Sequence, residues 1–443
     1  MLADVNYNKI EQYILDIPKF AGKHTLEDTR KLLGKAVGSP IHSKVIHIAG
    51  TNGKGSVCAY LRSILMQSGC SVGMFTSPHL ESMRERICLG EEMISKEDFT
   101  NAFDKVIRAW KELTREEDEE EKNRLHPSFF EFVFLMAMVY FDEKAPDYII
   151  LETGLGGRLD ATNCIEKPAA CVITEIGFDH MQYLGDTIEQ IAMEKAGIIK
   201  PGVPVVFFDK RIEVTDILKD CAKKVQSEAN IVEKNSILKV NIDNKTIDFS
   251  FHSGYYKYDS LFLDTTALYQ TENASLAIVT AEILKKTDKR ITTDSIRQGL
   301  REAHWPGRME EILPGVYLDG AHNEDGIEAF LSTVRESRLQ GKKYLLFGVV
   351  ADKQYEKMIK MIAEEGLFTE VAVTTLSSDR STSIDRLREI WEQYDVCCSF
   401  HSDAEEAFRY LMRVRKPTDI VYIAGSLYLV GQIRSLVRRI SDD

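Results

Sequence analysis

The sequence has little that would suit a secreted, membrane-spanning or nucleic-acid-binding protein. Its eight cysteines are scattered, apart from the neighbours Cys397 and Cys398, and none shows metal-ligand spacing, which favours a reducing, cytoplasmic setting. No apolar run approaches the length of a membrane span, and residues 1–6 lack the features of a signal peptide. The net charge of −13 provides no general excess of Lys and Arg, so we expect neither nucleic-acid nor membrane partners.

The composition is that of an ordinary globular protein. The chain has 443 residues, of which 44% are hydrophobic and 28% charged, and this length predicts two or three domains. Residues 129–141 are apolar nearly all round and predict a buried helix, whereas the acidic run 116–121 predicts an exposed loop.

A candidate phosphate-binding loop lies within residues 44–56, which read KVIHIAGTNGKGS. An apolar strand runs into a glycine-rich turn and then a helix-like pattern, so backbone N–H groups and a helix start can face an anion. Lys54 adds a point charge and Ser56 a possible Mg²⁺ ligand. Gly55 separates them, which departs from the general P-loop pattern. A nucleoside triphosphate site is the favoured interpretation, and a glycine-rich turn with a surface lysine is the alternative.

Strand and helix patterns alternate along the chain, which predicts a doubly wound α/β fold. Pro306-Gly307 interrupts the pattern, and a second α/β series follows. We therefore predict a P-loop-type ATPase domain over residues 1–302 and a smaller, Rossmann-like α/β domain over 303–443. An antiparallel excursion is expected at 243–251. The other predicted strands, besides the one entering the loop, are 71–75, 148–151, 170–174, 203–208, 316–318, 344–349, 370–374, 396–400 and 420–424.

Four further motifs, together with the glycine-rich loop, point to a particular protein family. They are TSPHL at 76–80, LETGLGGRLDATN at 151–163, DGAHN at 319–323 and GSLYLVG at 425–431. Together with the loop, they closely resemble folylpolyglutamate synthase and dihydrofolate synthase, the folate branch of the Mur ligase superfamily. The glycine after the loop lysine favours this branch, because cell-wall Mur ligases usually place Thr or Ser there.

The resemblance implies a nucleotide and metal site at the carboxyl edge of the first sheet. It assigns Mg²⁺ to Ser77 and Glu152, and a second metal ion to His180. A glutamate at this edge suits a hard cation, whereas bare chemistry would favour a structural role for the histidine. The residues implied to hold the phosphates are Thr51, Asn52, Gly53, Lys54, Gly55 and Ser56.

Lys195 completes the implied catalytic set of Lys54, Glu152 and His180. It follows a capping-box pattern at Thr187 and Gln190 and is implied to be carbamylated, with an ordinary ion pair as the equal alternative.

The resemblance also implies nucleotide contacts later in the chain. Arg308 is a candidate for a bidentate phosphate contact, Asp319 and His322 resemble nucleotide contacts, and Asn273 resembles a residue near the base or ribose. The chain departs from the family at Tyr269, where His is frequent, and at Gln354, where an acidic residue is common.

The folate acceptor is expected to need an apolar, aromatic slot. The segments that resemble this region are Ser128, Phe129, Phe130 and Glu131, and Leu159, Asp160 and Ala161. For the individual phenylalanines, a purely structural place in the core is the favoured alternative, since their spacing is helical.

The sequence thus predicts an ATP- and Mg²⁺-dependent ligase that adds glutamate to a folate, to dihydropteroate or to both, through an acyl phosphate. The expected partners are small molecules alone, the chain is expected to be monomeric, and a monovalent cation is left open. The alternatives are a Mur-type ligase acting on a UDP-linked peptide and a non-catalytic nucleotide-binding regulator. A P-loop kinase is disfavoured by the loop spacing.

Overall fold

The computed structural model describes residues 2–18, 24–38, 41–243, 245–378 and 380–442, which divide into two compact units by their internal contacts. The short segment Gly177–His180 belongs to unit 2, although the chain on both sides of it belongs to unit 1. Unit 1 consists of Met1–Ile176, Met181–Lys234 and Asn273–Ala303, and unit 2 of Gly177–His180, Asn235–Glu272 and His304–Asp443.

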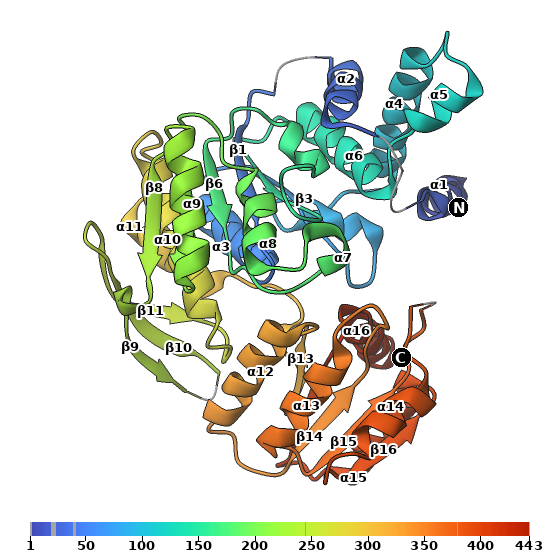
Figure 1. Ribbon diagram of the computed structural model, residues 1–443, viewed down its shortest axis with the longest axis vertical. Coiled ribbons are helices and arrows are strands. Elements are labelled where there is room, and N and C mark those ends of the chain that lie inside the picture. Colours follow the sequence, from blue (N-terminus) through green and yellow to red (C-terminus); the bar gives the residue numbers. More distant parts are fainter. Residues whose placement is uncertain (1, 19–23, 39–40, 244, 379, 443) are drawn as a thin grey trace. The chain divides into compact units, whose positions relative to one another are not determined.

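Unit 1 is built on an eight-stranded sheet with the order β4-β3-β2-β5-β1-β6-β7-β8 (Figure 1). The pairs from β2 through β8 are parallel, and β3 and β4 extend the sheet antiparallel at one edge. The predicted strands of this half are confirmed to within two residues at each end. The strands are β1 (Lys44–Ala49), β2 (Val72–Phe75), β3 (Ile87–Leu89), β4 (Glu92–Met93), β5 (Tyr148–Glu152), β6 (Ala170–Ile173), β7 (Val205–Asp209) and β8 (Ala229–Glu233).

The central strands are apolar on both sides, apart from His47 and the terminal residues Lys44 and Glu152, because both faces of the sheet are covered. Val45, Ile149 and Leu151 belong to the core around helix α6 (Phe129–Lys144), while the alternate residues Ile46 and Ile150 are equally buried. The remaining helices of this unit are α1 (Leu2–Asp16), α2 (Leu26–Val37), α3 (Lys54–Gln67), α4 (Lys96–Leu113), α5 (Glu119–Arg124), α7 (Met181–Leu184), α8 (Ile188–Ala196), α9 (Ile212–Lys224), α11 (Thr293–Glu302) and most of α10 (Gln270–Lys285). Its 3₁₀ turns are η1 (Met83–Arg86) and η2 (Ala161–Cys164), and a third turn, η3 (Lys234–Ser236), begins at Lys234 and continues into unit 2.

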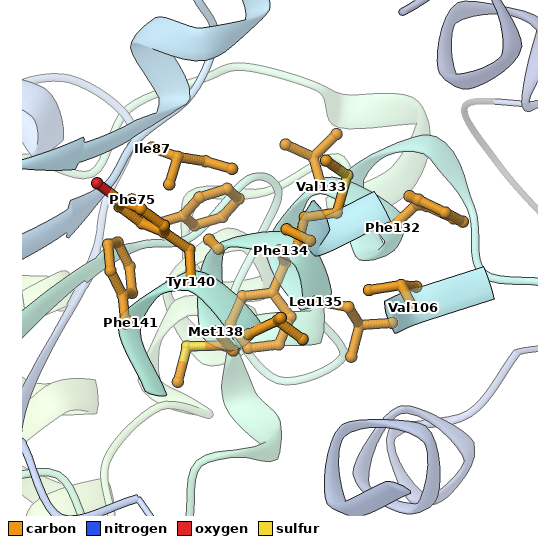
Figure 2. Close-up of a cluster of buried hydrophobic side chains, with 14 of the residues drawn as sticks. Phe75, Ile87, Val106, Phe132, Val133, Phe134, Leu135, Met138, Tyr140 and Phe141 are labelled. Atoms are coloured by element: carbon orange, nitrogen blue, oxygen red, sulfur yellow. The ribbon is translucent and has the colours of Figure 1, made fainter. Parts of the chain in front are cut away.

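Helix α6 is buried on all sides, as its uniform apolarity predicts. Every residue from Phe132 to Phe141 is buried, and the helix contacts β2 on one side and helices α1, α2 and α4 on the other. Figure 2 shows Tyr140 and Phe141 beside Phe75, and Leu135 beside Val106. The helix begins with a capping box formed by Ser128 and Glu131, which satisfies its first backbone donors.

The acidic run 116–121 is only partly the loop that the sequence predicts. Its residues are mostly exposed as expected, but helix α5 begins inside the run at Glu119. Asp118 caps this helix by accepting a hydrogen bond from the Glu121 amide at 2.9 Å. Acidic side chains in a first helical turn are favourable because they face the positive end of the helix dipole.

Unit 2 contains a six-stranded sheet with the order β12-β13-β17-β14-β15-β16 (Figure 1). The sequence places its first strand at 316–318, and the structure adds β12 before it as an antiparallel edge strand. The strands are β12 (Arg308–Leu313), β13 (Val316–Asp319), β14 (Lys343–Phe347), β15 (Glu370–Thr374), β16 (Cys398–His401) and β17 (Ile420–Ala424), and the helices are α12 (Glu324–Glu336), α13 (Tyr355–Glu365), α14 (Ile384–Trp391), α15 (Ala404–Val414) and α16 (Leu427–Asp442).

The antiparallel excursion expected at 243–251 is part of a larger three-stranded sheet in unit 2. Its strands are β9 (Ile237–Ile242), β10 (Ile247–His252) and β11 (Lys257–Leu263), paired in the order β11-β10-β9. Across the part of the chain that the structure describes, no helix has both the length and the apolarity to span a bilayer.

Truncating the α6 core tests how much unit 1 depends on it. We expect Phe134→Ala to lower the free energy of unfolding by about 3–5 kcal/mol, because the ring is fully buried and its loss leaves a cavity. Denaturant unfolding measures this change. The exposed variant Glu120→Gln is the control and should stay within about 0.5 kcal/mol of the parent protein; equal effects of the two would contradict the assigned burial.

Candidate active site

The nucleotide loop connects the carboxyl end of β1 to the first turn of α3. Its backbone is tied to the end of the neighbouring strand β6: the Thr51 amide donates to the Glu175 carbonyl at 2.7 Å, and the Thr174 hydroxyl donates to the Asn52 carbonyl at 2.7 Å. Helix α3 begins at Lys54 with no side-chain cap from its N-cap residue Gly53. The loop therefore presents a helix N-terminus at the carboxyl edge of a parallel sheet, where anions bind.

Two glycines of the loop are required by its conformation. Gly50 has φ +151°, and a Cβ there would lie 1.8 Å from the Thr174 hydroxyl oxygen. Gly53 has φ +87°, and its Cβ would lie 2.3 Å from Oδ1 of Asn273. The second contact places Asn273, predicted from the resemblance alone, directly against the nucleotide loop.

Two lysines converge on one carbonyl of this loop. Lys195 is buried and donates to the Gly50 carbonyl at 2.7 Å, and Lys54 donates to the same oxygen and to the Thr51 carbonyl, each at 3.1 Å. Helix α8, which carries Lys195, starts with the predicted capping box of Thr187 and Gln190. The two ammonium groups concentrate positive charge at the loop, which suits a polyphosphate.

Ser77 and Glu152 lie together at the same sheet edge. Glu152 is buried at the end of β5, Ser77 follows the adjacent strand β2, and the Ser77 amide donates to Glu152 Oε2 at 3.0 Å. Within the described ranges, no group of three or more His, Cys, Asp and Glu side chains could hold a metal ion. A hydroxyl and one carboxylate nevertheless fit Mg²⁺, which usually takes one or two carboxylates and completes its shell with phosphate oxygens and water.

His180 belongs to unit 2, where its neighbour Asp179 is the centre of a polar cluster. Asp179 Oδ1 accepts from Lys353 Nζ at 2.5 Å. Its Oδ2 accepts from Asn323 Nδ2 at 3.3 Å and lies 3.6 Å from His322 Nε2. Burial alone would raise the pKa of Asp179, but His322 and Lys353 lower it well below its usual range. His180 itself has a left-handed backbone with φ +51° and a partly exposed side chain.

Arg308 and Asp319 face each other across the first two strands of the unit 2 sheet. They are register partners in the β12–β13 pair, and Arg308 Nη1 lies against Gly320. Asp319 is buried and accepts from the Tyr269 hydroxyl at 2.6 Å. Burial raises the pKa of Asp319, while the charge of Arg308 and the bond from Tyr269 oppose that rise. Tyr269, where the family often has His, thus serves as a hydrogen-bond donor to Asp319.

The predicted acceptor residues at the start of α6 have mainly structural contacts. Ser128 and Glu131 form the helix cap, and Glu131 also pairs with His24 at 2.8 Å. Phe129 is partly buried with the Arg86 guanidinium 5.2 Å from its ring centroid, and Phe130 packs against the backbone of Gly154. The two rings therefore sit at the rim of the core and not in its centre.

The second predicted acceptor segment lies in residues 153–164, which we call the 153–164 loop. Leu159 is 68% exposed, whereas Asp160 and Ala161 are buried. Asp160 accepts hydrogen bonds from the amides of Gly154 at 2.8 Å and Leu155 at 2.9 Å, so its carboxylate holds the loop together.

Sequence reasoning missed several residues that shape these sites. Thr174 and Glu175 anchor the nucleotide loop. The sequence could have indicated them, because they come at the end of a predicted strand, as the loop does. Asp179 directly precedes His180 and is as polar as its neighbour, so it could have been singled out. Lys353 had no such signal, because its partner lies 174 residues away in the sequence.

The fold and the candidate site together indicate a class of enzyme. A glycine loop with two lysines, an adjacent Ser–Glu pair and a second α/β unit are the features of an ATP-dependent ligase, and residues 307–427 match the family model "Mur ligase, glutamate ligase domain". The chain is 33% identical over 440 residues to the dihydrofolate synthase/folylpolyglutamate synthase of Bacillus subtilis, covering 98% of this chain and 99% of that protein. It belongs to the folylpolyglutamate synthase/dihydrofolate synthase family of ADP-forming ligases, as its motifs predict.

Solved structures agree with this assignment. The folylpolyglutamate synthase of Thermotoga maritima superposes with a TM-score of 0.83 at 32% identity, covering 98% of this chain and 97% of that one. A structure described as an FPGS-AMPPCP-folate complex superposes with a TM-score of 0.82 at 28% identity, covering 98% and 99%. The predicted α/β fold class is confirmed.

The steric demand at Gly50 yields a matched pair of glycine variants. We expect Gly50→Ala to weaken ATP binding at least about 10-fold, because the new methyl group collides with Thr174 and must displace the loop. Gly69→Ala is the control, since Gly69 also has a left-handed backbone (φ +75°) but open space around its Cα. Calorimetric titration with ATP measures both, and equal affinities would contradict the loop geometry.

Proposed function

We propose that this protein is an ATP-dependent amide ligase that joins L-glutamate to a folate-type acceptor. The observation that carries the proposal is the pair of lysines on the Gly50 carbonyl, in a loop at the same sheet edge as Ser77 and Glu152. Family membership supports the reaction class, and the folate and ATP analogue named for the related complex support the substrates.

The chemistry follows from the weakness of a carboxylate as an electrophile. The acceptor carboxylate attacks the γ-phosphorus of ATP, ADP leaves, and an acyl phosphate forms. The amine of glutamate then attacks the acyl carbon, and phosphate leaves as the amide forms. Lys54 and the start of α3 neutralise and align the phosphates, while Lys195 holds the loop carbonyl from the interior.

Mg²⁺ would be held by Ser77 and Glu152, and when bound it supplies positive charge to the phosphoryl oxygens. The assignments of His180 to a second metal ion and of a carbamate to Lys195 stay predictions. Lys195 Nζ donates to the Gly50 carbonyl at 2.7 Å.

The two α/β regions are proposed to divide the substrates between them. Residues 1–302 carry the nucleotide loop and both predicted acceptor segments, and residues 303–443 include the part that matches the glutamate ligase domain. We propose that Arg308, Asp319 and His322 contribute to the nucleotide or glutamate end of the reaction. Monomeric state likewise stays a prediction.

Acceptor-dependent phosphate release tests the proposed function. With ATP, Mg²⁺ and glutamate, we expect release with tetrahydrofolate, with dihydropteroate or with both, and a matching glutamate mass added to each product. An acceptor-free reaction is the control. Release with both acceptors identifies a bifunctional enzyme, and release with only one assigns the step. Release only with a UDP-linked peptide, or with no acceptor at all, would contradict the proposal.

Substituting the metal-site carboxylate tests the proposed Mg²⁺ site. We expect Glu152→Gln to raise the Mg²⁺ concentration required for half-maximal phosphate release by about 10- to 100-fold, because an amide is a much weaker ligand than a carboxylate of the same shape. Titration of Mg²⁺ at saturating ATP measures the change. Glu120→Gln removes an exposed carboxylate that is not among the predicted site residues and should leave the Mg²⁺ requirement unchanged.

A further inference from the structure

A buried hydrogen-bonded chain joins strand β1 to the 153–164 loop. His47 Nε2 lies 2.8 Å from the Thr162 hydroxyl, and that hydroxyl donates to Asp160 Oδ1 at 2.5 Å. The Thr162 amide donates to the same oxygen at 3.0 Å, while the amides of Gly154 and Leu155 donate to Oδ2. His47 and Thr162 are completely buried, and Asp160 is 6% exposed.

The hydrogen bonds from His47 through Thr162 to Asp160 all run in one direction, which follows from the donors around Asp160. Burial raises the pKa of Asp160, but three backbone amides and the Thr162 hydroxyl all point at its oxygens and favour the unprotonated carboxylate, which accepts these bonds. The Thr162 hydroxyl has one hydrogen, which it donates in a hydrogen bond to Asp160, and its oxygen must therefore accept the hydrogen bond from His47. This requires the tautomer of His47 with its proton on Nε2.

The surroundings of His47 agree with that tautomer. Its Nδ1 atom is buried and has no hydrogen-bond partner among the residues that the structure describes, as expected of a nitrogen without a proton. Burial, aided by the charge of Lys200, lowers the pKa of His47 to about 3. The imidazole is thus a neutral, fixed donor at physiological pH.

His47 is well placed to link the two halves of the site in unit 1. It lies three residues before Gly50, on the strand that enters the nucleotide loop. The 153–164 loop is bonded to the same strand by the Thr153 amide, which donates to the Ile48 carbonyl at 2.9 Å. The loop also rests on α8, because the Arg158 amide donates to the Glu194 carbonyl, next to Lys195, at 2.7 Å.

We infer that His47, acting through Thr162 and Asp160, is a positioning residue that sets the 153–164 loop, and with it Leu159, for the planar aromatic part of the acceptor. The inference rests on the proposed function for the identity of that acceptor. Asp160 already accepts two hydrogen bonds on each oxygen, so it organises the turn. Leu159 is the exposed side chain of the predicted segment and is the one available to contact an apolar ligand.

A pair of variants at Thr162 separates positioning from general stability. Thr162→Val keeps the shape of the side chain and removes the hydroxyl, which leaves both His47 and Asp160 short of a partner. Thr162→Ser keeps the hydroxyl. We expect the valine variant to raise the KM for the folate acceptor about 10-fold or more, with the KM for ATP and kcat within about threefold of the parent enzyme, and the serine variant to restore the parent values.

Hydrogen exchange gives a second readout that needs no catalysis. In Thr162→Val we expect faster exchange in residues 153–164 and unchanged exchange in helix α3, and in Thr162→Ser neither change. An unchanged acceptor KM or unchanged loop exchange in the valine variant would overturn the inference. An equal rise in the KM for ATP would also overturn the inference, because the hydrogen bonds from His47 through Thr162 to Asp160 would then support the whole sheet edge.

The parent protein supplies a test that does not depend on a variant folding. Selective ¹⁵N labelling of histidine, with His47→Gln used for assignment, should show His47 as the neutral tautomer protonated on Nε2 from pH 8 to about pH 5. A proton on Nδ1, or an imidazolium in that range, would overturn the inference. Failure of the proposed function is recognised separately, because the parent enzyme would then show no acceptor-dependent phosphate release at all.

Discussion

The carbonyl oxygen of Gly50 is the point on which the rest of the site in unit 1 depends. It accepts hydrogen bonds from Lys195 of helix α8 and from Lys54 of the loop itself. Both bonds depend on the backbone conformation of Gly50, which brings this residue against Thr174. A carbonyl with two lone pairs can satisfy both donors, so two positive charges are held close together at the loop. Mutual repulsion of these charges is unfavourable in isolation, and an incoming polyphosphate relieves it.

The same few elements carry every predicted function of this unit. Strand β1 leads into the nucleotide loop and holds the 153–164 loop through His47, while β5 ends at Glu152 and continues directly into that second loop. Helix α8 provides Lys195 to one loop and the Glu194 carbonyl to the other. The predicted nucleotide, metal and acceptor positions therefore share one set of supporting elements, which suits a reaction whose catalysis is mostly alignment.

Unit 2 has a comparable centre in Asp179. A short segment of the chain between two parts of unit 1 contributes this carboxylate, and Lys353, His322 and Asn323 surround it with donors. A buried carboxylate is stable there only because a cation and hydrogen bonds compensate its lost hydration. The arrangement fixes the backbone on which His180 sits, so a residue predicted as a metal ligand is oriented by side chains that are remote in the sequence.

The amino-acid sequence by itself determined the fold class, the buried strands, the buried helix predicted over 129–141 and the family, because periodicity and glycine-rich motifs are local signals. It did not identify β12 as an edge strand or α5 as a helix, since both are short and polar and depend on weak caps and pairing. Only the tertiary structure decided what the buried polar groups do. Lys195 finds Gly50 across 145 residues, and His47 finds Thr162 across 115. Such partners are chosen by the need to satisfy each buried donor and acceptor, a requirement that exists only once the chain has folded around them.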